Sequence, residues 1–159
     1  MMVILDPGKS ENAQKIVSYI EETLDKEGIQ HTRTVEKGKT ASVEERCKEA
    51  NRWERSESIL ISVDINTGKK KENGWTAAVY HYSCGKSRKL ASCLKTRALI
   101  SRVPGTTPLP ESMYWETNHT ILRGTSMPSV LIGNPENCNL SLGELGDIIV
   151  EGIKDYYDL

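Results

Sequence analysis

Apolar positions along the chain follow two periods, one typical of strands and one typical of helices. Residues 2–5 form a short apolar run, which the turn sequence Asp-Pro-Gly at positions 6–8 brings to an end. After Ser10, apolar residues recur at helical spacing as far as Leu24, and Gly28 stands where a helix C-cap belongs. The chain is therefore expected to open with a strand, a tight turn and an amphipathic helix.

The same alternation continues to the end of the chain. Further strands are predicted by β-rich or apolar runs at residues 29–35, 58–63, 75–82, 119–122 and 129–132. Further helices are predicted where a serine precedes an apolar helical face, at Ser42, Ser87 and Ser141. Ser42 and Ser141 each stand three residues before a glutamate, which is the capping-box pattern. This order predicts a single domain over residues 1–159, a three-layer αβα sandwich with a mostly parallel central sheet.

In a parallel α/β sheet, functional sites lie beyond the carboxyl ends of the strands. Three positions in this chain meet that rule. Lys9 follows the first strand, Asp64 follows the strand at residues 58–63, and Gly133 follows the strand at residues 129–132. These three residues are therefore the centre of the candidate site.

The net charge and the distribution of apolar residues argue against several kinds of partner and site. The formal net charge is -1, from 21 basic and 22 acidic residues, so no overall field attracts nucleic acid. No apolar run approaches the roughly 20 residues of a membrane-spanning helix, and residues 1–5 are too short for the core of a signal peptide. The cysteines include no Cys-x-x-Cys pair, which argues against a zinc ribbon, and Cys47 and Cys93 are expected as buried free thiols.

Five segments of the chain carry motifs in a consistent order. They lie at residues 4–8, 42–51, 60–66, 74–82 and 121–132. The last reads Ile-Leu-Arg-Gly-Thr-Ser-Met-Pro-Ser-Val-Leu-Ile. In this order the segments resemble the zinc-dependent N-acetylmuramoyl-L-alanine amidases of the Amidase_3 family, which cleave peptidoglycan between muramic acid and the stem peptide. The resemblance spans nearly the whole chain and implies the fold of a cell-wall amidase.

The positions that carry the chemistry in that family differ in this chain. The resemblance places Lys9 and Asp64 where the family has zinc-binding histidines, and Gly133 where it has its catalytic glutamate. A further zinc-binding glutamate of the family lies beyond a glycine-rich loop that is missing here. Glu11 is the one candidate to replace it, because Lys9 is followed at once by Ser10 and Glu11.

These differences bear directly on catalysis. A zinc hydrolase needs about three ligands with lone pairs and a base for the metal-bound water. A lysine ammonium offers no lone pair, and Gly133 cannot transfer a proton. We therefore expect no zinc cofactor and no ordinary amidase activity, and we interpret the chain as a pseudoenzyme that serves as a peptidoglycan-binding, regulatory or assembly module. The alternative is a divergent active amidase or endolysin with other metal ligands, for example Asp64, Glu11 and His81.

The charges at the strand ends support a further hypothesis. If Lys9 and Asp64 meet, the ammonium would occupy the region of the lost cation and pair with Asp64 and with Glu11. The other interpretation is that Lys9 points from a loop into water. Asn66 and Arg123 match family positions near the groove, and each could either bind a ligand or act as a structural hydrogen-bonding residue.

The sequence indicates the binding partner and the cellular location of the protein only in general terms. The expected partner is peptidoglycan or a protein, and the shortened loop after Lys9 exposes surface that also suggests a homo-oligomer. Because the chain shows no signal peptide, location stays open between the cytoplasm and release to the cell wall in a lysis, division or sporulation system.

Overall fold

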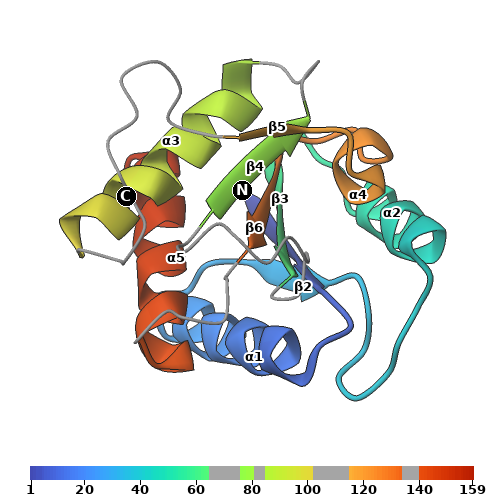
Figure 1. Cartoon of the computed structure of the whole chain (residues 1–159), viewed down its shortest axis with the longest axis horizontal. Helices are drawn as coiled ribbons and strands as arrows, with labels where there is room; N and C mark the ends of the chain where they lie inside the picture. Colours follow the sequence, from blue (N-terminus) through green and yellow to red (C-terminus); the bar gives the residue numbers. More distant parts are fainter. Residues whose placement is uncertain (65–75, 81–84, 102–114, 134–139) are drawn as a thin grey trace.

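Strands and helices alternate along the chain, as the sequence predicts. The computed structural model describes residues 1–64, 76–80, 85–101, 115–133 and 140–159. The strands are β1 (Met2–Pro7), β2 (His31–Arg33), β3 (Ser58–Asp64), β4 (Thr76–Tyr80), β5 (Trp115–Thr117) and β6 (Ser129–Gly133). The helices are α1 (Glu11–Lys26), α2 (Val43–Arg52), α3 (Gly85–Ile100), α4 (Thr120–Arg123) and α5 (Leu142–Tyr157), as drawn in Figure 1.

One six-stranded sheet forms the centre of the fold, in the order β2-β1-β3-β6-β4-β5. The strands β2, β1, β3 and β6 run parallel, with Leu5 opposite Ile61 and Ile61 opposite Val130. β4 is antiparallel to β6 and parallel to β5. The predicted mostly parallel sheet is therefore confirmed, with one antiparallel pairing toward one edge.

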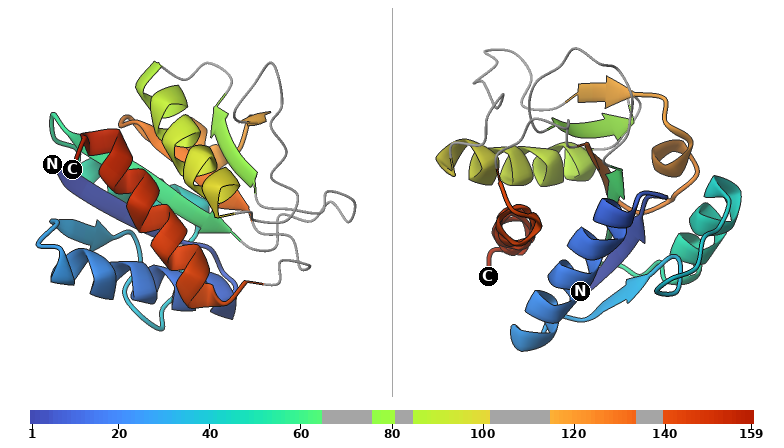
Figure 2. Two further views of the ribbon diagram at one scale, coloured as in Figure 1. Left: turned by 90° about the vertical axis from the view of Figure 1, so that its left-hand side faces the viewer. Right: turned by 60° about the horizontal axis from the view of Figure 1, so that its bottom comes forward.

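Helices cover both faces of this sheet (Figure 2). Each face has its own apolar core. Helices α1, α3 and α5 pack against one set of strand residues, which includes Val3 and Ile61. Helices α2 and α4 pack against the alternate set, which includes Ile4 and Leu60. Because successive side chains of a strand point to opposite faces, the apolar strands β1 and β3 are buried on both sides. The predicted three-layer αβα sandwich is confirmed.

Both predicted capping boxes are present. Ser42 Oγ accepts a hydrogen bond from the backbone N–H of Glu45 at 3.2 Å, and Glu45 Oε2 accepts one from the backbone N–H of Ser42 at 2.8 Å. Ser141 and Glu144 make the same reciprocal pair at the start of α5, at 3.2 and 2.7 Å. These contacts satisfy backbone donors that the first turn of a helix leaves without partners.

Replacing Ser141 by alanine should lower the free energy of unfolding by about 1 kcal/mol, because the Glu144 backbone N–H loses its acceptor. Urea unfolding followed by circular dichroism measures the change. Ser141→Asn is the matched control, since asparagine caps a helix about as well as serine and should stay within a few tenths of the parent. Equal losses in the two variants would contradict a capping role.

No described helix is long and apolar enough to cross a membrane. Cys47 is buried in the core, as expected, but Cys93 of α3 is only half-buried. Cys84 and Cys138 lie outside the described residues.

The structure corrects the predicted strand at residues 119–122. This segment forms the short helix α4, which His119 caps by accepting a hydrogen bond from the backbone N–H of Ile121 at 3.4 Å. The carbonyl oxygen of Ile121 in turn accepts a hydrogen bond from Thr125 Oγ1 at 2.9 Å. Local polar contacts of this kind favour a helical turn, and so short an apolar run carries no period that distinguishes it from a strand.

A second correction concerns the start of α3. The helix begins at Gly85, so Ser87 lies inside it rather than at its N-cap. Ser87 is buried, and its Oγ accepts a hydrogen bond from the backbone N–H of Ser129 at 3.1 Å. The serine thus ties α3 to the beginning of β6. The short strand β5 was not predicted.

Candidate functional site

The parallel pairing of β1, β3 and β6 brings the predicted site positions together at the carboxyl ends of these strands. Pro7, at the end of β1, lies opposite Val63 of β3, and Asp64 lies opposite Gly133 of β6. Lys9 follows β1 after Gly8, so it lies at the same end of the sheet as Asp64 and Gly133. The predicted convergence of three neighbouring strand ends is present.

The turn after β1 packs closely against the end of β3. The backbone N–H of Gly8 donates to the carbonyl oxygen of Val63 at 2.7 Å. A Cβ atom added at Gly8 would lie 2.8 Å from that oxygen and 3.2 Å from Asp64 Oδ1. The position therefore requires glycine because no side chain fits, and the half-buried Asp64 carboxylate lies against the turn.

The expected ion pair at these strand ends is not formed. Lys9 is exposed, and within the described part of the chain no ion pair joins it to Asp64 or to Glu11. Glu11 is exposed and instead pairs with Lys15, one turn further along α1, at 2.6 Å. The hydrogen bond from Lys15 lowers the pKa of Glu11 below its ordinary value. The hypothesis that Lys9 closes the site by pairing with these carboxylates gains no support from a direct ion pair among the described residues, and the exposure of Lys9 favours the interpretation that it points into water.

Of the two remaining predicted residues, only Arg123 can be placed. Arg123 ends α4, is exposed, and donates from Nη1 to Asn118 Oδ1 at 3.1 Å. This contact is structural in kind and leaves other donors of the guanidinium for a ligand. Asn66 and His81 lie outside the described residues.

A buried polar network lies directly beneath the strand ends, and the sequence analysis missed it. Asp6 of β1 is 0% exposed; its Oδ2 accepts from Arg46 Nη1 at 3.0 Å and from Ser62 Oγ at 2.7 Å. Its Oδ1 accepts from Thr34 Oγ1 at 2.5 Å. Arg46 Nη1 also donates to the carbonyl oxygen of Pro7 at 3.2 Å. One carboxylate therefore joins β1, β3, α2 and the segment after β2.

Burial dominates the electrostatics of this network. It raises the pKa of Asp6 above its ordinary value, although the Arg46 guanidinium and three hydrogen bonds act in the opposite direction. A signal for the network is present in the sequence. Arg46 stands on the face of α2 that carries Cys47 and Ala50, so a charged residue occupies an apolar position of an amphipathic helix.

A second set of polar contacts supports the turn from the side of α1. Gln14 Nε2 donates to the carbonyl oxygen of Gly8 at 3.3 Å, while Gln14 Oε1 accepts from Arg33 Nη2 at 2.7 Å. Arg33 Nη1 donates to Glu21 Oε2 at 3.2 Å. The backbone that carries Lys9 is therefore held from both α1 and α2.

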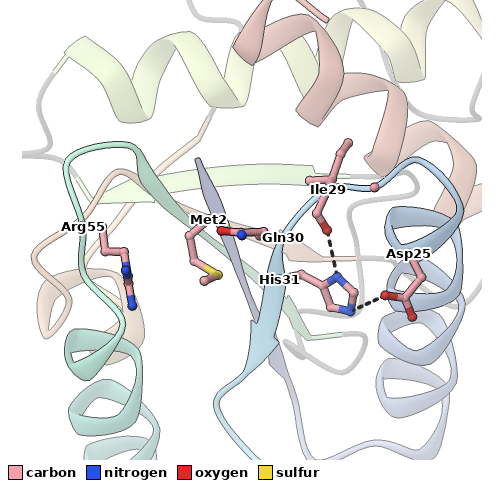
Figure 3. Close-up of a pocket in the computed structure, with 7 residues that line it drawn as sticks. Met2, Asp25, Ile29, Gln30, His31 and Arg55 are labelled. Atoms are coloured by element: carbon pink, nitrogen blue, oxygen red, sulfur yellow. Dashed lines mark hydrogen bonds and ion pairs between the residues drawn. The ribbon is translucent and has the colours of Figure 1, made fainter.

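A separate cavity opens at the amino ends of the strands, where β1 and β2 begin (Figure 3). It measures about 610 Å³ and includes Met2, His31 and Arg55 in its lining. His31 Nδ1 donates to the carbonyl oxygen of Ile29 at 3.1 Å, and its Nε2 lies 3.8 Å from Asp25 Oδ1. His31 is thus a partly buried residue with local partners, remote from the strand ends that carry Lys9.

In the part of the chain that the structure describes, metal-binding side chains do not cluster at the carboxyl ends or at the amino ends of the strands. No group of three or more His, Cys, Asp or Glu residues among the described residues is arranged to hold a metal ion. At the three strand ends the described side chains supply one carboxylate, that of Asp64, beside a lysine and a glycine. A catalytic zinc site takes about three protein ligands, so this donor set does not fit zinc.

The fold agrees with the comparisons to known proteins. Residues 7–136 match the N-acetylmuramoyl-L-alanine amidase family, Amidase_3, so the chain belongs to this family. A comparison with curated proteins finds no significant match.

Three solved structures of amidases share the fold over nearly their whole length. An N-acetylmuramyl-L-alanine amidase of Mycobacterium smegmatis superposes with a TM-score of 0.83 at 15% identity, covering 99% of this chain and 97% of that one. An amidase of Clostridium difficile 630 gives 0.78 at 19% identity, covering 99% and 96%. The CwlD amidase of Clostridioides difficile, solved in complex with the GerS lipoprotein, gives 0.73 at 17% identity, covering 99% and 98%. At these identities the likeness establishes the fold.

Proposed function

We propose that this chain is a non-catalytic member of the amidase family that binds peptidoglycan through the carboxyl edge of its sheet. The observation that carries the proposal is the exposed Lys9 at the end of β1, a position to which the resemblance assigns the first zinc ligand of the family. A fixed positive charge repels a metal cation at short range and offers it no lone pair. The resemblance places Gly133 where the family has its catalytic glutamate, and a glycine has no side-chain group that can hold a proton.

The framework beneath the edge supports a retained binding role. Asp6, Arg46 and Ser62 remain linked by buried hydrogen bonds, so the turn that carries Lys9 is well supported. Burying a charge pair without need costs stability, and a chain that had lost all function at this edge would gain by replacing it with apolar residues. The framework therefore argues for an edge that still contacts a ligand.

The first test combines metal analysis with two assays on the full chain. We expect well below one zinc per chain by elemental analysis, no release of stem peptide from muropeptides, and cosedimentation with purified peptidoglycan sacculi. The cleavage assay is run with and without added Zn²⁺, so that metal lost in purification does not decide the result.

Two outcomes would change the proposal. One zinc per chain together with cleavage would overturn it in favour of an active amidase or endolysin with other ligands. Failure to sediment with sacculi would overturn peptidoglycan binding and favour a protein-binding role. The CwlD amidase, which was solved with a lipoprotein partner, provides a precedent for that second role. Light scattering on the same sample tests the expected homo-oligomer, which a monomeric mass would contradict.

A further inference from the structure

A small notch lies between the turn after β1 and the segment that follows β2. Its lining includes Gly8, Lys9, Gln14, Lys39 and Arg46. It measures about 10 Å³, which is about the room that a single water molecule or one ligand oxygen needs. Three of these side chains are cationic and none is acidic, so the notch is chemically suited to an oxygen that carries negative charge.

The cations of the notch are not equally engaged. Arg46 is only 8% exposed and uses Nη1 for Asp6 and Pro7, while its buried Nε has no hydrogen-bond partner within the described structure. Lys39 forms an ion pair with Glu36. Lys9 forms no ion pair with any carboxylate in the described part of the chain. Of the three cations of the notch, it is therefore the one available to pair with a ligand.

Two neutral residues of the notch already hold partners in the protein. Gln14 is committed through both of its side-chain polar atoms, to the Gly8 carbonyl oxygen and to Arg33. Gly8 has its backbone N–H engaged with Val63. The charged partners that a ligand oxygen in the notch would meet include the Lys9 ammonium and the Arg46 guanidinium, both of which form strong hydrogen bonds to a carboxylate.

We propose that this notch binds a carboxylate of the ligand, with Lys9 as the cation that contacts it. This inference rests on the proposed function, because the carboxylates of peptidoglycan stem peptides are the anions that such a ligand brings to the edge. The position to which the resemblance assigns a metal ligand thus carries a positive charge of the protein itself, and the interaction that we propose there is a charge-assisted hydrogen bond.

The notch is tested by amide chemical shifts of the full ¹⁵N-labelled chain during titration with a soluble muropeptide. We expect the dissociation constant to rise about fivefold in Lys9→Met, which corresponds to loss of one exposed ion pair. Lys9→Arg should restore most of the affinity. Lys48→Met is the matched control, because Lys48 is exposed on α2 and is not among the residues that line the notch. Unchanged affinity in Lys9→Met would overturn the proposal.

A second comparison isolates the carboxylate. The same muropeptide with its carboxylates amidated should bind the native chain about fivefold more weakly and should bind Lys9→Met with no further loss. Equal binding of the two muropeptides to the native chain would overturn the inference and leave a structural water as the occupant of the notch.

Failure of the inference and failure of the proposed function are distinguishable. If native protein and Lys9→Met sediment equally with sacculi, peptidoglycan binding stands and the notch is rejected. If the native chain ignores sacculi, acetate becomes the probe, and shifts confined to the amides of Gly8, Lys9 and Arg46 would support the notch alone. Absence of those shifts would reject it. Lys9 is exposed, so thermal unfolding of Lys9→Met should match the native chain and exclude misfolding.

Discussion

Replacing Arg46 by methionine should lower the free energy of unfolding by about 3–5 kcal/mol, because it leaves the Asp6 carboxylate buried without its counter-charge. The pair is deeply enclosed, since the side chains of Arg46 and Asp6 are 9% and 0% exposed. Ser62 and Thr34 would still donate to Asp6, but hydroxyl groups do not neutralise a charge. Urea unfolding with linear extrapolation measures the change.

Two controls identify the cause. Arg52→Met removes an ion pair to Glu49 from the same helix, but the Arg52 side chain is 70% exposed, so the loss should be at most about 1 kcal/mol. Combining Arg46→Met with Asp6→Asn removes both charges and should cost less than Arg46→Met alone. If the double variant is instead less stable by the sum of the single losses, the two side chains act independently and the buried pair is not the cause.

The charge explanation also predicts how the stability loss of Arg46→Met changes with pH. Because burial raises the pKa of Asp6 in the folded state, the folded protein holds its proton to higher pH than the unfolded chain, whose value is near 3.8. The contribution of Asp6 to stability therefore falls as pH rises from about 3.8 through the raised folded pKa. Arg46→Met raises that pKa further, so the loss of stability should be smallest in acid, where Asp6 is neutral, and should grow toward neutral pH. A loss independent of pH would contradict the charge explanation.

Local signals in the sequence were sufficient where a structure depends on near neighbours. Ser42 and Glu45 stand three residues apart, and their capping box forms as predicted. The convergence of Lys9, Asp64 and Gly133 was also predictable, because parallel strands end at a common edge and the apolar runs located the strands. The amidase family itself was predictable from the order of its motifs.

Contacts that join distant segments were not predictable in the same way. Asp6 and Arg46 are 40 residues apart, so their pairing depends on how α2 packs on the sheet. The expected ion pair of Lys9 with Asp64 is absent from the described residues for a related reason. Adjacent strand ends bring backbones together, but the direction of a side chain is set by the turn that carries it, and this turn leaves Lys9 in water.

Replacing Gly152 by alanine should destabilise the protein by about 1–3 kcal/mol, although alanine favours a helix. Gly152 lies in α5 where this helix crosses α3, and a Cβ atom there would sit 2.7 Å from Leu94 Cδ2 and 2.8 Å from Leu94 Cα. A side-chain tip could turn aside, but a backbone atom moves only with its helix. The two helices would have to separate, which opens space in a core that is otherwise closely packed.

Gly143→Ala provides the matched control on the same helix. Its added Cβ would lie 3.4 Å from the nearest atom, Tyr19 Cε2, which is ordinary contact, so stability should stay unchanged or rise slightly through helix propensity. Thermal unfolding separates the two variants, because about 1 kcal/mol moves the midpoint by roughly 2–4 °C in a chain of this size. Equal midpoints would mean that α3 moves away from Gly152 without cost.

The two destabilising substitutions also separate the core from the candidate site. Gly152 packs with Leu94 in the α3 and α5 layer, whereas Arg46 hydrogen-bonds to the Pro7 carbonyl oxygen directly before the turn that carries Lys9. Below its unfolding midpoint, Gly152→Ala should therefore keep the native affinity for a muropeptide. Arg46→Met should lose affinity even when fully folded, because it removes a donor of the notch together with the support of its turn. Equal affinities of the two folded variants would contradict the link between the buried network and the strand-end site.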